Sequence, residues 1–146
     1  MLVSDVLTAK ARSLVTATSD MPVPQAMSLL LDNRISCLPI IDSQGRLIGI
    51  VSDKDIFRLV HEQPREFVHG SIGDIMTIRL FTAQPADDLL SIAGLMTNRR
   101  IRHVPVIDHG KLVGLISIGD VVKAQLDAVV GENEHLRKYI SGDYPA

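Results

Sequence analysis

With 146 residues, the chain has room for one compact domain or two intertwined halves, which excludes a large multidomain enzyme. Apolar residues make up 46% and charged residues 22%, so we expect a folded domain with an aliphatic core rather than a disordered chain. The formal net charge of -2 argues against general binding to nucleic acid or to an anionic membrane. The single cysteine, Cys37, excludes an intramolecular disulfide and a Cys-based zinc site. Together with the lack of a signal-peptide pattern and of a long apolar run, it predicts a soluble, cytoplasmic protein.

The first half predicts a strand, a helix, a hairpin of two strands and a second helix, in that order. The first strand includes Lys10 and Val15, and the helix covers residues 22–33, where apolar residues recur at helical spacing after Asp20 as the N-cap. LPIID and RLIGIVS then form two strands joined by a turn at residues 43–45, and the next helix covers residues 53–61. Because both strands are nearly continuous aliphatic runs, we expect the sheet to be covered on both faces.

A polar stretch over residues 61–71, with Pro64 and Gly70, predicts a linker to a second half that repeats the first. Residues 35–58 align with residues 101–123, and nine of the 23 aligned pairs are identical, which indicates a tandem duplication. The second half therefore has a helix over about residues 86–98, strands in VPVID and KLVGLIS, and a helix from about residue 119. Since a half of this size is marginal alone, we expect the halves to pack around a pseudo-two-fold axis with a cleft between them.

The C-terminal helix carries a series of positions at alternating steps of four and three, which is a heptad pattern. These positions are Val122, Leu126, Val129, Asn133, Leu136 and Ile140. Two interpretations remain open: the helix folds back on its own core, or this seam contacts a second chain. Gly131 lowers the stability of the helix by about 1 kcal/mol relative to Ala, which favours a packed helix.

A Gly-x-x-Ser-x-x-Asp segment follows the last strand of each half, as GIVSDKD at residues 49–55 and GLISIGD at residues 114–120. The serine lies where the strand gives way to the helix, and the aspartate lies in the first helical turn, where free amides attract an anion. A carboxylate there can accept both hydroxyls of a ribose, and each such bond contributes about 1.5–3 kcal/mol. The alternative is helix capping without a ligand, which two copies in equivalent places make less attractive.

The strings RISCLPIIDSQGRLIGIVSDKD and RIRHVPVIDHGKLVGLISIGD resemble a tandem pair of CBS (cystathionine β-synthase) domains over about residues 3–125. The resemblance implies an α+β fold of two β-α-β-β-α units at residues 1–64 and 65–128, with a C-terminal helical tail at residues 129–146. It also implies a regulatory or sensor module, similar to stand-alone bacterial two-CBS proteins. Such a module binds an adenosine-containing ligand (AMP, ADP, ATP, NAD or S-adenosylmethionine) and requires no cofactor.

In this family, each site combines the serine and aspartate of one half with the strand around the proline of the other half. The resemblance therefore implies one site with Ser52, Asp55, Arg102, His103 and Pro105, and a second with Ser117, Asp120, Ser36, Cys37, Pro39, Lys10 and Val15. In each site the aspartate would hold the ribose, backbone and aliphatic groups would enclose the adenine, and the serine with basic groups would meet a phosphate. Because Arg102 and His103 supply positive charge, the first site suits a phosphorylated ligand, and the second suits a less charged ligand or none.

The sequence shows neither a Gly-rich phosphate loop nor a serine elbow, so no enzymatic activity and no metal site are predicted. Cys37 lies in an aliphatic strand, which favours a buried thiol over a nucleophile. One alternative function is a nucleotide-independent structural or interaction protein with decayed sites, suggested by Ser36, Cys37 and the heptad. An enzyme acting on a nucleotide phosphate is suggested by His103 alone. The resemblance implies a homodimer and an unidentified regulated protein as partners, with no membrane or nucleic acid.

Overall fold

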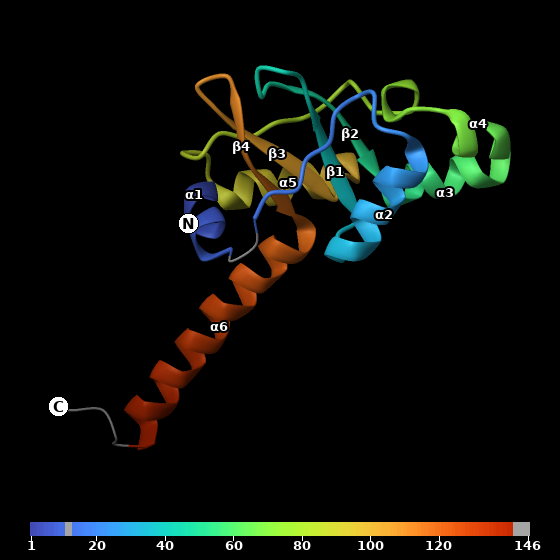
Figure 1. The fold of residues 1–146 in the computed structure, drawn as a ribbon. Coiled ribbons are helices and arrows are strands. Elements are labelled where there is room, and N and C mark those ends of the chain that lie inside the picture. Colours follow the sequence, from blue (N-terminus) through green and yellow to red (C-terminus); the bar gives the residue numbers. More distant parts are fainter. Residues whose placement is uncertain (11–12, 142–146) are drawn as a thin grey trace.

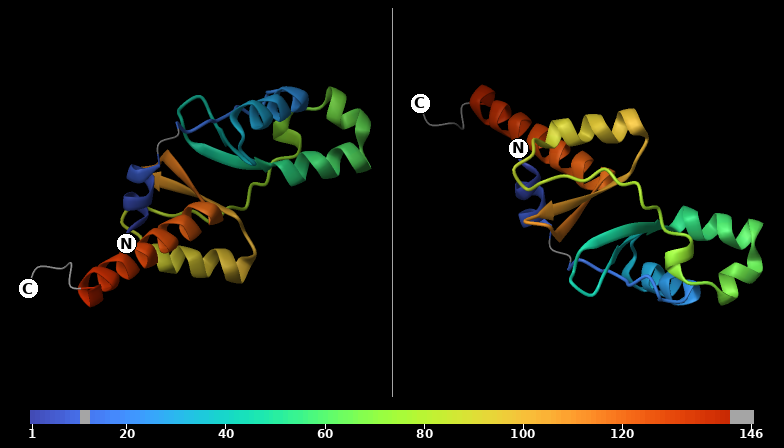
Figure 2. Two further views of the ribbon diagram at one scale, coloured as in Figure 1. Left: turned by 90° about the horizontal axis from the view of Figure 1, so that it is seen from below. Right: turned by 90° about the horizontal axis from the view of Figure 1, so that it is seen from above.

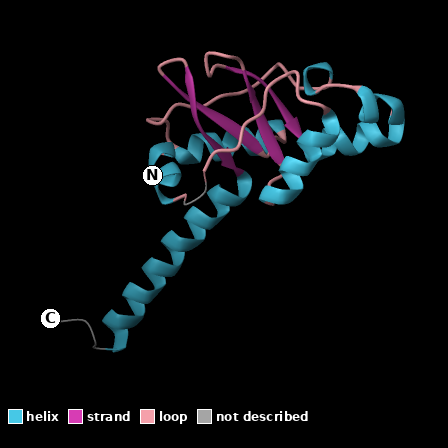
Figure 3. Cartoon of the chain, viewed as in Figure 1, coloured by secondary structure: helices cyan, strands magenta, loops and turns pink. Residues whose placement is uncertain are grey.

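The computed structural model describes residues 1–10 and 13–141, which form two similar halves followed by a long helix (Figures 1 and 3). The helices are α1 (Val3–Ala9), α2 (Val23–Asn33), α3 (Asp53–Glu62), α4 (Pro64–His69), the 3-10 helix η1 (Ile72–Asp74), α5 (Leu89–Arg99) and α6 (Ile118–Ser141). The strands are β1 (Cys37–Ile41), β2 (Leu47–Ser52), β3 (His103–Asp108) and β4 (Lys111–Ser117). The mixture of helices and two small sheets with a C-terminal helix confirms the predicted α+β class.

Each half contains one antiparallel hairpin, and the two hairpins match position by position. Pro39 pairs with Ile50 in β1–β2, and Pro105 pairs with Leu115 in β3–β4. A register shift follows at the equivalent place in each first strand, between residues 40 and 41 and between residues 106 and 107. Figure 2 shows the hairpins in the middle of the molecule, with α5 and α6 on one side and α2, α3 and α4 on the other. The predicted duplication is therefore present in the backbone as well as in the sequence.

The predicted first strand of each half is reduced to a single parallel bridge. Ala17 bridges Ile40 and Ala83 bridges Val106, and each alanine exchanges two backbone hydrogen bonds with its neighbouring strand at 2.8–3.1 Å. The prediction of a strand at Lys10 is wrong, because Lys10 ends α1. Val3 and Val6 are buried one turn apart on this helix, so tertiary packing rather than local propensity accounts for it.

Each half packs its N-terminal helix into the core of the other half. Val3 and Val6 of α1 belong to the core formed with α5, β3, β4 and α6, whereas Ile72 of η1 belongs to the core formed with α2, β1, β2 and α3. A methyl group at Gly114 would lie 2.6 Å from a side-chain carbon of Leu7, and one at Gly49 would lie 2.6 Å from the sulfur of Met76. The lack of a side chain at each glycine therefore leaves room for a side chain from the other half's N-terminal segment, Leu7 at Gly114 and Met76 at Gly49. The domain boundary at residues 64 and 65 stays a prediction.

Three local predictions differ from the structure near helix ends. Asp20 is not the N-cap of α2, which is Pro22; the carboxylate of Asp20 instead accepts a hydrogen bond from the Thr18 hydroxyl at 2.5 Å. Helix α5 begins at Leu89 rather than near residue 86, because the Asp88 carboxylate caps it by accepting the Ser91 N–H at 3.2 Å. The polar stretch at residues 61–71 is largely helical, since a proline at position 64 is compatible with the first turn of α4.

The expectation that both faces of each sheet are covered holds only in part. Strand β1 is buried at its first four residues, but the side chains of β4 alternate, and Val113 is 46% exposed. One face of the β3–β4 hairpin therefore contacts solvent, and only the other face is covered.

Helix α6 extends away from the rest of the molecule (Figure 1). Its seam positions Val122, Leu126, Val129 and Leu136 are 48%, 58%, 52% and 50% exposed, and Asn133 is exposed as well. Of the two interpretations left open, a seam folded back on its own core does not hold for these residues. The side chain of Ile140 lies outside the described ones. Among the described residues, no helix combines the length and the apolar content needed to cross a membrane.

Candidate functional site

The two Gly-x-x-Ser-x-x-Asp segments form capping boxes at the start of α3 and of α6. The Ser52 N–H donates to Oδ2 of Asp55 at 2.8 Å, and the Asp55 N–H donates to the Ser52 hydroxyl at 3.3 Å. The matching pair in the second half, Ser117 and Asp120, has distances of 2.9 and 3.1 Å. The capping role is thus present in both copies, and it fixes each carboxylate at a strand-to-helix junction.

Asp120 differs from Asp55 because Lys10 reaches it from the end of α1. The Lys10 ammonium donates to Oδ2 of Asp120 at 2.7 Å and to the carbonyl of Leu115 at 2.8 Å. Their side chains are 28% and 20% exposed. Burial alone would raise the pKa of Asp120, but the hydrogen bonds from Lys10 and from the Ser117 N–H outweigh it and hold the pKa below its ordinary value. Asp120 is therefore ionised and held in place at neutral pH.

His103 and Ser36 connect the two halves across the site. Nε2 of His103, at the start of β3, lies 3.2 Å from the hydroxyl of Ser36, just before β1. Burial, together with the nearby charges of Arg102 and Lys10, lowers the pKa of His103 below its ordinary value. The imidazole is consequently neutral at neutral pH and offers a hydrogen bond rather than a charge.

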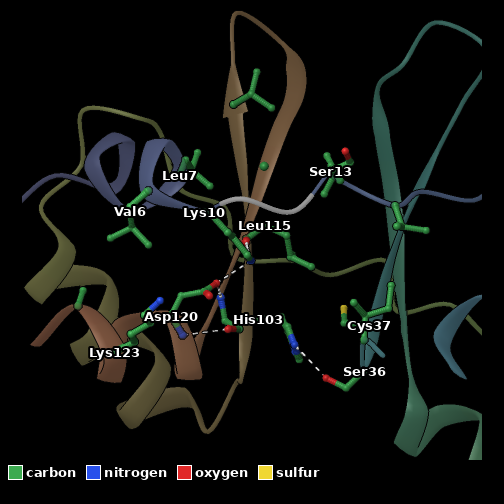
Figure 4. A pocket seen from close by; sticks show the side chains of 18 of the residues that line it. Val6, Leu7, Lys10, Ser13, Ser36, Cys37, His103, Leu115, Asp120 and Lys123 are labelled. Carbon is green, nitrogen blue, oxygen red and sulfur yellow. Dashed lines mark hydrogen bonds and ion pairs between the residues drawn. The ribbon is translucent and has the colours of Figure 1, made fainter. Parts of the chain in front are cut away.

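A cavity of about 1250 Å³ lies between the halves and contains these groups (Figure 4). Its polar lining includes Lys10, Ser13, Ser36, His103, Ser117, Asp120 and Lys123, and its apolar lining includes Val6, Leu7, Val15, Cys37 and Leu115. This volume is larger than the roughly 300–1,000 Å³ of ordinary small-molecule sites, so a nucleoside would fill only part of it. A concave surface with a mixture of apolar groups and a few placed polar groups is typical of a small-molecule site.

The described charges that line the cavity nearly balance. Four aspartates contribute negative charge and three side chains contribute permanent positive charge: Asp5, Asp32, Asp120 and Asp127 against Lys10, Arg34 and Lys123. Because the bases, even with the terminal amino group of Met1, do not outnumber the acids, the described part of the lining is not a site specialised for a polyanion.

Cys37 lies in this lining as an unreactive thiol. Its side chain is buried, and burial followed by the negative charges of Asp55 and Asp53 raises its pKa to about 12. The prediction that Cys37 is a buried thiol rather than a nucleophile is confirmed. In the described part of the chain, no group of three His, Cys, Asp or Glu residues is placed to hold a metal ion.

The structure gathers one of the two predicted residue sets and divides the other. Of the second set, Lys10, Val15, Ser36, Cys37, Ser117 and Asp120 line the cavity, whereas Pro39 lies in the hairpin and its carbonyl accepts the Ala17 N–H at 3.1 Å. His103, which the sequence grouped with Ser52 and Asp55, lines this same cavity. The remaining four residues of the first set, Ser52, Asp55, Arg102 and Pro105, are not among the lining residues of this cavity.

Several lining residues escaped the sequence analysis. Asp5 and Leu7 lie on α1, which was not predicted as a helix. Lys123 follows Asp120 by three residues, so both lie on one face of α6, and this spacing could have identified it.

Comparison with known proteins identifies the family. The model of the CBS domain matches residues 3–62 and 72–127. The CBS domain-containing protein CBSX3 of Arabidopsis thaliana, a mitochondrial protein, is 34% identical over 97% of this chain and 73% of its own length.

Three solved structures share the fold. A putative signal-transduction protein with CBS domains from Burkholderia ambifaria is 35% identical, with a TM-score of 0.81 over 87% of this chain and 95% of its own. CBSX2 in complex with AMP is 30% identical, with a TM-score of 0.76 over 87% and 97%. The CBS domain pair of MJ0100, in complex with 5-methylthioadenosine and S-adenosyl-L-methionine, is 27% identical, with a TM-score of 0.76 over 88% and 98%. With two matched segments spread over most of its length, this chain belongs to the CBS domain family.

Proposed function

We propose that the cavity between the halves binds an adenosine-containing ligand and that the protein is a regulatory module responding to that ligand. The observation that carries the proposal is the fixed carboxylate of Asp120 in a cavity to which both halves contribute. The complexes of CBSX2 with AMP and of MJ0100 with 5-methylthioadenosine and S-adenosylmethionine support it. Binding, rather than catalysis, is the proposed activity.

Asp120 is the proposed acceptor for the ribose hydroxyls. Its Oδ2 already accepts from Lys10 and from the Ser117 N–H, and within residues 1–10 and 13–141 no hydrogen bond to Oδ1 is present. Oδ1 can therefore accept a hydroxyl without breaking the capping box. The apolar side chains of Val15 and Leu115 would contact the adenine, since both line the same cavity.

The preferred ligand carries at most one phosphate. The described lining has no excess of positive charge, since four carboxylates face three cationic side chains and the terminal amino group of Met1, and the neutral imidazole of His103 adds none. Bringing several phosphates near Asp5 and Asp127 costs electrostatic free energy. AMP, S-adenosylmethionine or 5-methylthioadenosine is accordingly favoured over ATP. A second site at Ser52, Asp55, Arg102 and Pro105, suited to a phosphorylated ligand, also remains a proposal.

Isothermal titration calorimetry with AMP, ATP and S-adenosylmethionine tests this function. Asp120→Asn removes the charge of the acceptor and is expected to lower affinity by about 10- to 100-fold, the equivalent of one charge-assisted hydrogen bond. Asp108→Asn, at the last residue of β3 and outside the lining of the cavity, is the matched control and should retain full affinity. The absence of heat with every adenosine compound would contradict the proposal.

The second candidate is an interaction protein that acts without a nucleotide, and the exposed apolar residues of α6 favour it. Capture of a partner with an affinity that nucleotides leave unchanged would support this candidate. We also propose a homodimer and a cytoplasmic location. The first follows from the family resemblance and the second from the single, unpaired cysteine.

A further inference from the structure

His103 lies inside the cavity where the two halves meet. It is the first residue of β3, and in the hairpin it pairs with Ser117, whose N–H donates to Asp120 at 2.9 Å. From the other half, the hydroxyl of Ser36 lies 3.2 Å from Nε2 of His103. Figure 4 shows the imidazole between the Lys10–Asp120 pair and Ser36. Because Asp120 is the proposed ribose acceptor, a bound ligand would lie beside this ring.

One nitrogen of the ring is held, and the other is available to a ligand. The Ser36 hydroxyl can accept a hydrogen from Nε2 or donate one to it, so this contact persists whether the imidazole is neutral or protonated. Within residues 1–10 and 13–141, Nδ1 has no hydrogen-bond partner, and no unpartnered side-chain nitrogen of these residues is sealed from solvent. Nδ1 is therefore open to the cavity, and protonation of the ring makes it a charged donor.

The charges around His103 keep the ring neutral when no ligand is bound. Burial lowers its pKa most, and the positive charges of Arg102 and Lys10 lower it further. The carboxylates of Asp53, in the first turn of α3, and of Asp120, in the first turn of α6, raise the pKa but do not compensate. An additional negative charge beside the ring would shift this balance towards the protonated form.

The other titratable side chains near the ring keep their charge as the pH changes around neutrality. Cys37 stays a neutral thiol because its pKa is about 12, and Asp120 stays ionised because its pKa is below its ordinary value. The described lining also contains the amino group of Met1 and the side chains of Asp5, Asp32, Arg34, Lys123 and Asp127. Among the described side chains of the cavity, His103 is therefore the one whose type changes charge between pH 5 and 8.

We propose that His103 lets the pH decide which adenosine-containing ligand the cavity prefers: a ligand with one phosphate binds together with a proton on the imidazole, and a ligand without a phosphate binds without that proton. The inference rests on the proposed function. A phosphate near the ring offsets the repulsion from Arg102 and Lys10, and it can accept a charge-assisted hydrogen bond from Nδ1. Adenosine offers no such charge, so its complex leaves the buried imidazole neutral.

Binding of AMP and binding of a proton then favour each other. Because the bound phosphate raises the pKa of His103 above its ligand-free value, the complex takes up a proton wherever the pH lies between the two values. The affinity for AMP therefore rises as the pH falls through the bound-state pKa, and the gain levels off below the ligand-free pKa. The affinity for adenosine should change little over the same range.

Isothermal titration calorimetry with AMP and adenosine at pH 6 and pH 8 tests this linkage. His103→Gln keeps a hydrogen-bonding group beside Ser36 but cannot take up the proton. The ratio of AMP affinities, wild type over His103→Gln, should be about threefold or more larger at pH 6 than at pH 8. Taking this ratio cancels the titration of the phosphate itself near about pH 6 and of the Met1 amino group. For adenosine, the ratio should be equal at both pH values.

His109→Gln is the matched control, because His109 lies in the turn between β3 and β4 with its side chain 94% exposed. This variant should show the same pH dependence as the wild type. An NMR titration gives a second readout on the wild-type protein: the midpoint of His103 should move upward on saturation with AMP and stay unchanged with adenosine.

The outcomes separate the linkage from ligand binding itself. If AMP binds but the affinity ratio is equal at pH 6 and pH 8, or if AMP does not raise the midpoint of His103, the linkage is overturned and the proposed function stands. If AMP binds at neither pH, both the linkage and the proposed function are overturned.

Discussion

Replacing Lys10 by methionine tests how the structure holds the candidate site together. Methionine keeps the apolar stem of the side chain but removes the ammonium, which donates to Asp120 at 2.7 Å and to the Leu115 carbonyl at 2.8 Å. Since the two side chains are 28% and 20% exposed, the pair is largely protected from solvent screening. A hydrogen bond to a charged group contributes about 1.5–3 kcal/mol, so the free energy of unfolding at pH 7 should fall by about 2 kcal/mol.

The loss should also depend on pH. The pKa of Asp120 is lower in the folded protein than its ordinary value of 3.8, so the carboxylate stabilises the fold above that value. This stabilisation disappears as the pH falls through the folded-state pKa, because the protonated acid no longer pairs with Lys10. The difference between wild type and Lys10→Met should therefore shrink below about pH 4, and a smaller decline is expected already below pH 6.5, because Lys10 lowers the pKa of His103 and its removal relieves that repulsion.

Urea unfolding followed by circular dichroism measures both quantities. Arg46→Met is the matched control: Arg46 pairs with Asp42 at 3.0 Å, but its side chain is 61% exposed, so its loss should change stability little. The reasoning would be refuted if Lys10→Met cost no more stability than Arg46→Met, or if its cost were the same at pH 3 as at pH 7.

Three further outcomes follow from single positions. Gly131→Ala should raise the free energy of unfolding by up to about 1 kcal/mol in urea titrations, because alanine favours the helix and, among the described residues, no atom beyond the adjacent residues and the local helix backbone lies within 4 Å of the added methyl group; a lower stability would count against it. Cys37, with a pKa near 12 and 3% exposure, should react with a thiol reagent at pH 8 only after denaturation, and rapid labelling of the native protein would contradict its burial. The imidazole of His103 should titrate below pH 6.5 in an NMR experiment, and a midpoint above 6.5 would show that the charged form is favoured instead.

The sequence was informative where structure depends on local patterns. The hairpins of both halves, the helices that follow them and the serine and aspartate at each junction were predicted because strand patterns, turns and the internal repeat identify them twice. The capping boxes at Asp55 and Asp120 lie where the repeat places them.

The parts that were missed depend on contacts between distant segments. Helix α1 has only seven residues and is stabilised by Val3 and Val6 packing into the core of the second half, which no local pattern reveals. The same exchange brings Lys10 to Asp120. The resemblance grouped these two residues correctly, but Lys10 was expected in a strand and instead follows α1. His103 was grouped with Ser52 and Asp55 because the resemblance implies that the strand of one half faces the serine and aspartate of the other, whereas in the structure His103 lines the cavity that contains Asp120.

A crystal structure of the protein with AMP is the most direct test of the proposed ligand site. We expect density for the nucleotide in the cavity between the halves, with a ribose hydroxyl within hydrogen-bond distance of Oδ1 of Asp120 and the adenine against Val15 or Leu115. Density for the nucleotide only outside this cavity, or a cavity filled by the chain itself at saturating AMP, would contradict the account.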